Sequence, residues 1–227
     1  MSSIITQKPL SLADQVFERI EDDILSGKYE RGSLISESRL SEELGVSRTP
    51  IREALRRLEQ EHLIEDSKKG MVVIGISPED AETIFLIRRQ VEGFAAGVCA
   101  MKITEEQLAD LTETLDLQFH YLEKHKLEKE TTYDSEFHKK IYRYSGSVII
   151  EDTLTLLHRK TWTFRKTSMI STERALKSVE EHRAILEAIA AHDRKRAEKA
   201  MADHVENARL HLVSIGAISN TALAMED

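Results

Sequence analysis

The stretch from Leu40 to Leu58, LSEELGVSRTPIREALRRL, decides the fold of the N-terminal part of this chain. Leu40 and Leu44 share one face of a short helix, and Gly45 follows it at a position where glycine commonly ends helices. After a tight turn, Ser47 begins a second helix whose proline falls in the first turn, where its missing N–H costs no hydrogen bond. The apolar face of this second helix comprises Ile51, Ala54, Leu55 and Leu58. Two short helices joined in this way predict a helix-turn-helix.

The flanking sequence extends this unit to a winged helix-turn-helix. Apolar residues recur at helical spacing between Leu12 and Leu25, which predicts a further helix ahead of the motif. Behind the motif, two β-prone segments, 62–65 and 71–74, are joined by a turn. Three helices and a two-stranded ribbon describe a winged DNA-binding domain, to which we assign residues 1–76.

The rest of the chain, residues 77–227, is predicted to be a second, helical domain. The 227 residues include only 9 Gly and 3 Pro, so helix breakers are scarce. This scarcity excludes a collagen-like or low-complexity chain and argues against a turn-rich β-sandwich. The predicted fold class is mainly α, and Ser77 and Pro78 form a helix start at the domain boundary. The second domain is expected to be an antiparallel six-helix bundle, with helices near 78–100, 104–125, 127–144, 147–170, 173–191 and 193–213.

The second helix of the motif carries residue types that read DNA. Arg48 and Arg52 are four residues apart and share the face opposite the apolar one. Arginine can bond guanine bidentately in the major groove and can pair with phosphate. Hydroxyls and free N–H groups at a helix N-terminus favour phosphate oxygens, and a glycine at the ribbon turn lets the backbone approach DNA closely. The candidate DNA contacts are therefore Ser47, Arg48, Thr49, Arg52, Lys69 and Gly70; the alternative is a merely solvated basic face.

The net charge of −8, from 32 Lys and Arg against 40 Asp and Glu, would by itself argue against a nucleic-acid partner. Residues 1–76 hold 11 basic and 14 acidic residues, a net −3. The segment 47–58, however, holds four arginines against one glutamate, a net +3. The positive charge is therefore local, and we expect weak non-specific binding and an affinity that depends on dimerisation.

The expected location is the cytoplasm. Cys99 is the only cysteine, so no internal disulfide can form, which fits a reducing compartment. No run approaches the ~18 apolar residues of a membrane span, and the first residues show no signal-peptide pattern. We therefore expect no membrane association.

Four residues of the second domain form a candidate metal site. Asp134 and His138 lie four apart on one predicted helix, so a carboxylate and an imidazole face the same point. His182 and His204 each lie beside an apolar stripe on later helices. Three neutral imidazoles and a carboxylate suit a divalent ion such as Zn²⁺, Ni²⁺ or Mn²⁺. Each histidine alone is more commonly an ordinary core or surface residue. No comparable partner is expected for His62, His120, His125, His158, His192 and His211.

The segment Leu40–Leu58 resembles the DNA-binding signature of the GntR family of bacterial transcription regulators. The resemblance implies DNA contacts from the recognition helix and the wing tip, through Arg48, Thr49, Arg52 and Gly70. The family often has an arginine two positions before the leucine that matches Leu40. This chain has Ser38 there, with Arg39 beside it, and we include Arg39 among the candidate DNA contacts.

Residues from about 78 to 212 resemble the FCD ligand-binding domain of the FadR branch of that family. The matching segments are Ile87-Arg88 with Glu92, Asp134 with Phe137-His138, Glu181 to Ile185, and His204. In metal-containing members the matching aspartate and three histidines bind the ion, which implies the ligand set Asp134, His138, His182 and His204. The arginine matching Arg88 faces the effector pocket in the family; the alternative here is an ion pair with Glu92. The six predicted helices resemble the shorter variant of the domain rather than the seven-helix one.

These observations predict a homodimeric, ligand-responsive transcription regulator, a repressor that binds near-palindromic operator DNA. A small carboxylate effector would bind at the metal, with Arg88 clamping it. The alternative is a metal-dependent hydrolytic enzyme with a His₃Asp site and the N-terminal domain as an appendage. Its candidate bases, Glu181 and Asp203, point about 100° away from the ligands beside them in the sequence. A third reading is a DNA-binding protein whose metal is purely structural.

Overall fold

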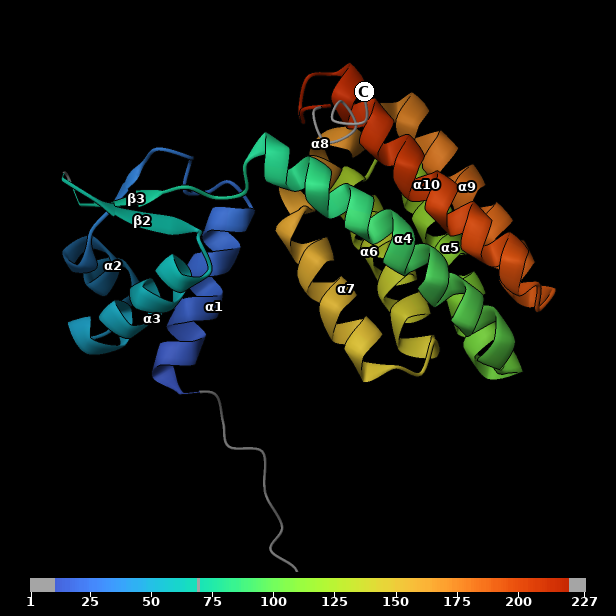
Figure 1. The fold of residues 1–227 in the computed structure, drawn as a ribbon, viewed down its shortest axis with the longest axis horizontal. Coiled ribbons are helices and arrows are strands. Elements are labelled where there is room, and N and C mark those ends of the chain that lie inside the picture. The colour runs from blue at the N-terminus through green and yellow to red at the C-terminus, as the bar shows by residue number, and fades with distance from the viewer. Residues whose placement is uncertain (1–10, 69, 221–227) are drawn as a thin grey trace, which may run out of the picture. The chain divides into compact units, whose positions relative to one another are not determined.

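The computed structural model describes residues 11–68 and 70–220, which form two compact units. The first unit is Met1–Ser77 and the second is Pro78–Asp227. The ribbon in Figure 1 shows a small unit of helices and strands and a larger unit built of helices. Within the described ranges, none of the helices combines the length and the apolar character that a membrane span requires.

The first unit has three helices and a small antiparallel sheet. Strand β3 lies between the other two, in the order β1-β3-β2, and pairs Val72 with both Leu34 and Glu65. The elements in chain order are α1 (Leu12–Leu25), β1 (Leu34–Ile35), α2 (Glu37–Leu44), α3 (Arg48–Gln60), β2 (Ile64–Ser67) and β3 (Gly70–Val73). This arrangement confirms the winged helix-turn-helix.

Local capping chemistry sets the ends of these helices. Ser11 and Asp14 form a reciprocal capping box at the start of α1, and Ser36 caps α2. Gly45 ends α2 in the left-handed region with φ of 65°, a conformation that glycine adopts without steric cost. The apolar stripes of the helices and sheet then close over one core, whose largest fully buried members are Ile20, Leu40, Ile51, Leu58, Leu63 and Ile64.

The wing differs in detail from the predicted ribbon. Its strands are shifted from 62–65 and 71–74, because His62 turns the chain with φ of 57° directly after α3. The carbonyl of Leu63 then accepts hydrogen bonds from the N–H groups of Ile74 and Gly75 rather than pairing in the sheet. The third strand, β1, is only two residues long and leaves no alternating pattern in the sequence.

The second unit has seven helices among its described residues, which corrects the predicted six. They are α4 (Pro78–Lys102), α5 (Glu105–Glu123), α6 (Leu127–Tyr144), α7 (Val148–Lys160), α8 (Trp162–Met169), α9 (Thr172–Ala190) and α10 (Arg194–Ser214). The predicted helix 147–170 breaks at Thr161, where φ is −97° and ψ is 9°. The hydroxyl of this buried threonine accepts a hydrogen bond from Arg88 at 3.0 Å, so a tertiary contact accompanies the break. The mainly helical fold class is nevertheless confirmed.

Helices α4 and α10 pack against each other along their length, side by side in Figure 1. Gly93 permits this approach, because a Cβ atom at that position would lie 2.9 Å from the backbone oxygen of Glu198. The interior that the seven helices enclose is unusually polar. Its buried ionisable side chains include Arg88, Glu92, Glu130, Asp134, His138, His158, Arg165, Arg174, His182 and His204. Buried charges of this kind need partners, so the bundle interior is the place to look for a site.

Substituting Gly93→Ala is expected to destabilise the second unit by about 1–3 kcal/mol, because the methyl group meets backbone that cannot rotate away. Gly97→Ala, one turn along α4, is the matched control. There the nearest atoms to the added methyl group belong to the side chain of Glu198, which must move but can do so by rotation, so a smaller loss is expected. Urea unfolding monitored by circular dichroism measures both; equal stability of the two variants would contradict the close-packing explanation.

Candidate functional site

The exposed face of α3 carries most of the predicted DNA contacts. Arg48, Thr49 and Arg52 are all exposed, while the opposite face of the helix is buried in the core. Ser47 is the N-cap residue, and among the described residues its hydroxyl makes no capping hydrogen bond. The N-terminal turn of α3 therefore presents side-chain and backbone donors to solvent, which suits phosphate oxygens.

Arg52 is held by an acidic residue of the preceding helix. Its Nε and Nη2 atoms donate to the two carboxylate oxygens of Glu37 at 3.0 and 2.9 Å. The hydrogen bonds and charge of Arg52 lower the pKa of Glu37. The arginine side chain remains 69% exposed, so this bidentate pair lies on the surface. A partner for Arg52 on DNA must therefore compete with, or add to, an existing acceptor.

The other predicted DNA contacts are Arg39, Lys69 and Gly70, whereas Arg57 of α3 has a structural role. Arg39 is exposed on α2, and Gly70 is exposed at the start of β3 with φ of 115°. Lys69 lies outside the described residues. Arg57, by contrast, pairs with Asp14 at 2.6 Å and lies 4.0 Å from the centroid of the Phe17 ring. Arg57 therefore ties α3 to α1 and is not part of the exposed face.

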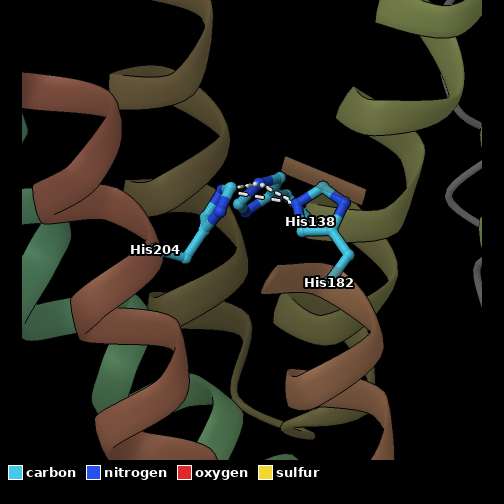
Figure 2. Close-up of side chains that lie close together, drawn as sticks. All are labelled: His138, His182 and His204. Atoms are coloured by element: carbon cyan, nitrogen blue, oxygen red, sulfur yellow. Dashed lines mark hydrogen bonds between the residues drawn. The ribbon is translucent and has the colours of Figure 1, made fainter. Parts of the chain in front are cut away.

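In the second unit, three histidines from three helices converge on one point. Figure 2 shows the imidazoles of His138 on α6, His182 on α9 and His204 on α10 directed toward one another. Their Nε2 atoms lie 3.2 to 3.3 Å apart in all three pairs. All three side chains are buried. The structure therefore brings together three of the four predicted ligands and confirms that the three helices meet.

Each histidine is oriented by a hydrogen bond at its other ring nitrogen. Nδ1 of His138 lies 2.8 Å from a Glu92 oxygen, and Nδ1 of His204 lies 2.7 Å from a Glu181 oxygen. Carboxylates only accept, so both histidines carry their proton on Nδ1. This is the outer-shell arrangement typical of metal-binding histidines.

Nδ1 of His182 faces the side-chain oxygen of Gln118 at 2.8 Å. The amide nitrogen of Gln118 donates to Glu130 at 2.9 Å and to Asp134 at 3.4 Å, which fixes the orientation of this amide. His182 must then also carry its proton on Nδ1. Three Nε2 lone pairs consequently face one another at the centre of the cluster.

This donor set fits a divalent metal ion. Three lone pairs at 3.2 to 3.3 Å repel one another unless a cation lies among them. Imidazole nitrogens that bind Zn²⁺ at about 2.0–2.1 Å with tetrahedral angles are separated by about 3.3 Å, which agrees with the spacing in the structure. Burial and the neighbouring histidines lower the pKa of His182 well below its ordinary value, and burial also lowers that of His138. Neutral imidazoles are the form that binds metal.

Asp134, the fourth predicted ligand, lies at the edge of the cluster. One of its oxygens is 3.8 Å from Nε2 of His182, and the other accepts a short hydrogen bond from Arg165. Burial acts to raise the pKa of Asp134, but the charges of Arg165, His138 and His204 together lower it. Asp134 is therefore an ionised carboxylate beside the histidines, already engaged by an arginine.

Arg88 makes the ion pair that the sequence left as an alternative. Its Nε donates to Glu92 at 2.6 Å inside the bundle, where both side chains are buried. Burial acts to raise the pKa of Glu92, yet the charge of Arg88 and then that of His138 lower it. Glu92 thus links Arg88 to a candidate metal ligand.

His158 was expected to lack a comparable partner, and this expectation was wrong. It is buried between two arginines. Its Nε2 atom accepts a short hydrogen bond from Arg165, and its Nδ1 atom is 3.5 Å from Nη2 of Arg88. Nδ1 is also 3.2 Å from the hydroxyl of Tyr142. Burial, with the charges of the two arginines, lowers the pKa of His158 well below its ordinary value. His158 is therefore a neutral acceptor within the site.

A pocket opens beside the histidine cluster. It is lined by Arg88, Asp134, His138 and His204, and about 30 Å³ of it is open to the centre of a water-sized sphere. A concave site with a few convergent polar groups is typical of small-molecule binding. Further lining residues are Phe85, Arg165, Ser168, Met169, Arg174, Ser178, Val205, Ala208 and Leu212.

Sequence reasoning missed the residues that support the ligands. The side chains of Gln118, Arg165 and Arg174 pair with residues more than four positions away in the sequence, so no local motif marks them. The sequence marks Glu181 as part of a family-matching segment and as a candidate general base of the enzyme alternative. It instead accepts from His204, which lies on the next helix. Only the i to i+4 relation of Arg88 to Glu92 offered a local signal.

The winged helix-turn-helix and the helical second unit define a two-domain, DNA-binding bacterial regulator. Residues 12–73 match the model of the gntR family of bacterial regulatory proteins, and residues 83–207 match the FCD domain. The chain therefore belongs to the GntR family and carries an FCD domain. It is a DNA-binding transcription regulator rather than an enzyme, so the hydrolase alternative is set aside.

Individual relatives agree with this assignment. The chain is 26% identical over 220 residues to the uncharacterized HTH-type transcriptional regulator YdhC of Bacillus subtilis, covering 93% of this chain and 96% of that protein. It is 36% identical over 94 residues to the gluconate operon transcriptional repressor of Bacillus licheniformis, covering 41% of this chain and 39% of that protein. Among solved structures it resembles Escherichia coli McbR/YncC with a TM-score of 0.77 and 23% identity, covering 92% of this chain and all of that one. This last likeness shows the fold.

Replacing Arg52→Ala is expected to weaken operator binding by about tenfold or more, with a smaller loss on random DNA. The reason is that a base-reading arginine contributes to sequence discrimination as well as to phosphate attraction. Fluorescence anisotropy with both DNAs measures the difference. An equal loss on both would reduce Arg52 to a phosphate contact.

Glu37→Gln tests the restraint on Arg52. Removing the competing carboxylate is expected to raise affinity for random DNA by about twofold to fivefold, in line with an exposed ion pair. If Glu37 acts through Arg52, this gain disappears in the Glu37→Gln, Arg52→Ala double variant. A gain that persists there would show that Glu37 acts only through general charge repulsion.

Proposed function

We propose that this regulator is a homodimeric repressor of the FadR branch whose operator affinity is changed by a small carboxylate. The carboxylate binds at a divalent metal held in the FCD domain. The observation that carries the proposal is the convergence of three Nε2 atoms beside a pocket that also contains Arg88. Repression is supported by the similarity to the gluconate operon transcriptional repressor of Bacillus licheniformis.

At the DNA end, we assign the exposed face of α3 to the major groove and the wing tip to the adjacent backbone. Arg48 and Arg52 would contact bases or phosphates, and Ser47 and Thr49 would bind phosphate at the helix N-terminus. Arg39 on α2 and Gly70 on the wing complete the proposed contacts. All six residues are exposed. Lys69 remains a prediction from the sequence alone.

At the effector end, His138, His182 and His204 would hold Zn²⁺, Ni²⁺ or Mn²⁺, with Asp134 as the fourth ligand. Such an ion supplies a positively charged site for a carboxylate oxygen. Glu92, Gln118 and Glu181 keep the imidazoles in the tautomer that leaves Nε2 free. The guanidinium of Arg88 lines the same pocket and is suited to bind a carboxylate.

Dimerisation is supported by an apolar stripe on α4. Ile87, Phe94 and Met101 stand seven residues apart, so they follow one face of the helix, and they are 44%, 48% and 53% exposed. Large apolar residues aligned on an exposed helix face typically mark an interface. We assign this face to contact with a second copy of the chain, which would give two recognition helices for a near-palindromic operator.

His182→Ala is expected to abolish stoichiometric metal binding, since it removes one of three converging nitrogens. Gln118→Ala should weaken metal binding by about 10–100-fold while leaving the three ligands in place. Elemental analysis and chelator competition measure the two effects, with His211→Ala as a control outside the cluster. Metal retained at full stoichiometry in His182→Ala would contradict the ligand assignment.

The regulatory function is tested with an operator selected from a random-sequence DNA pool. Anisotropy titrations compare metal-loaded and chelator-treated protein, each with and without a panel of small carboxylates. A carboxylate should shift operator affinity only in the metal-loaded protein. If metal removal lowers the melting temperature but no carboxylate alters DNA binding, the metal is structural.

Phe94→Glu should convert the dimer to a monomer, because a charge within the apolar stripe cannot be buried against its copy without a large desolvation cost. Light scattering coupled to size exclusion measures the mass, and operator affinity should fall with it. Leu176→Glu on α9 is the control, because that exposed leucine lies outside the stripe. An unchanged dimer in Phe94→Glu would place the interface elsewhere.

A further inference from the structure

The pocket is also lined by polar residues that the proposed metal site does not use. Ser168 on α8 and Arg174 on α9 both line it, and both side chains are buried. In the part of the chain that the structure describes, neither the Ser168 hydroxyl nor Nε of Arg174 has a hydrogen-bond partner. Buried polar groups are normally satisfied, so two orphans in one pocket indicate a missing acceptor.

Arg174 is otherwise well fixed. Its Nη1 and Nη2 atoms donate to Glu181 at 2.9 and 2.7 Å, which leaves Nε–H as the free edge of the guanidinium. Glu181 in turn accepts from Nδ1 of His204. A ligand group bound at Nε would therefore be connected to a candidate metal ligand through one carboxylate.

The balance of charge also favours an anionic group. The buried arginines Arg88, Arg165 and Arg174 face three carboxylates, Glu92, Asp134 and Glu181, which they pair one to one. A divalent ion at the histidines would add two positive charges to this neutral set. Anionic groups of a ligand, together with the buried Glu130, can balance these two added charges.

We propose that the effector is a dianionic acid. One carboxylate binds at the metal end of the pocket, and the second accepts hydrogen bonds from Nε of Arg174 and the hydroxyl of Ser168. This inference rests on the proposed function, because it needs the first carboxylate at the metal. It specifies that the effector carries two anionic groups and names the residues that bind the second group.

Pairs of acids that differ only in the second carboxylate test this directly. Isothermal titration of metal-loaded protein compares malonate with propionate, succinate with butyrate, and glutarate with pentanoate. At least one dicarboxylate should bind about tenfold more tightly than its match, which is the scale of a charged hydrogen bond. Binding within twofold in all three pairs overturns the second subsite but leaves the metal-bound carboxylate intact. Failure of every acid to bind protein with stoichiometric metal overturns both proposals.

Ser168→Ala tests the residue assignment with little risk to folding, because the hydroxyl has no partner to lose. It should weaken the preferred dicarboxylate by about tenfold and leave its monocarboxylate match and the metal content unchanged. Thr167→Val on the same helix is the matched hydroxyl deletion, since Thr167 does not line the pocket. Equal affinities of Ser168→Ala and wild type for the dicarboxylate would overturn the assignment of Ser168.

Arg174→Lys provides the second variant, keeping a positive charge for Glu181 while removing Nε–H. It should reduce dicarboxylate affinity without reducing that of the monocarboxylate. Arg183→Lys, an exposed position on the same helix, is its control. If Arg174→Lys weakens both acids equally while the metal content stays intact, Arg174 acts only through its positive charge. That result would overturn its assignment as a ligand of the second carboxylate.

Discussion

The interior of the FCD domain depends on the tautomer of three histidines. Each Nδ1 proton is held by an oxygen of Glu92, Gln118 or Glu181, and each Nε2 is thereby directed at the other two. These three acceptors are themselves held by Arg88, Glu130 and Arg174. The polar interior is therefore one connected network, in which the orientation of each ring follows from partners two layers away.

Local signals predicted the elements of the fold well. Gly45 ends α2 and α4 begins at Pro78, as the sequence predicts, because such signals act on backbone within a few positions. The break between α7 and α8 was missed for the opposite reason. Thr161 is no strong helix breaker, and its hydroxyl is met by Arg88, which lies 73 positions earlier in the chain.

The same distinction separates the predicted from the missed site residues. Helical spacing placed Asp134 with His138, the apolar stripes singled out His182 and His204, and the family resemblance joined the four residues as one ligand set. Two of the surrounding arginines were missed, because a buried arginine looks like any surface arginine until its partner is known. Arg165 and Arg174 are recognised as interior residues only once α6, α8 and α9 are packed together.

Thr161 alone separates α7 from α8, so chain length fixes the register of α8. One added or deleted residue there would turn α8 by about 100° about its axis. Arg165 and Ser168 would then leave the pocket together, and Asp134 would lose its arginine. The contacts that α8 makes in the pocket therefore depend on the length of this junction as much as on the identity of its side chains.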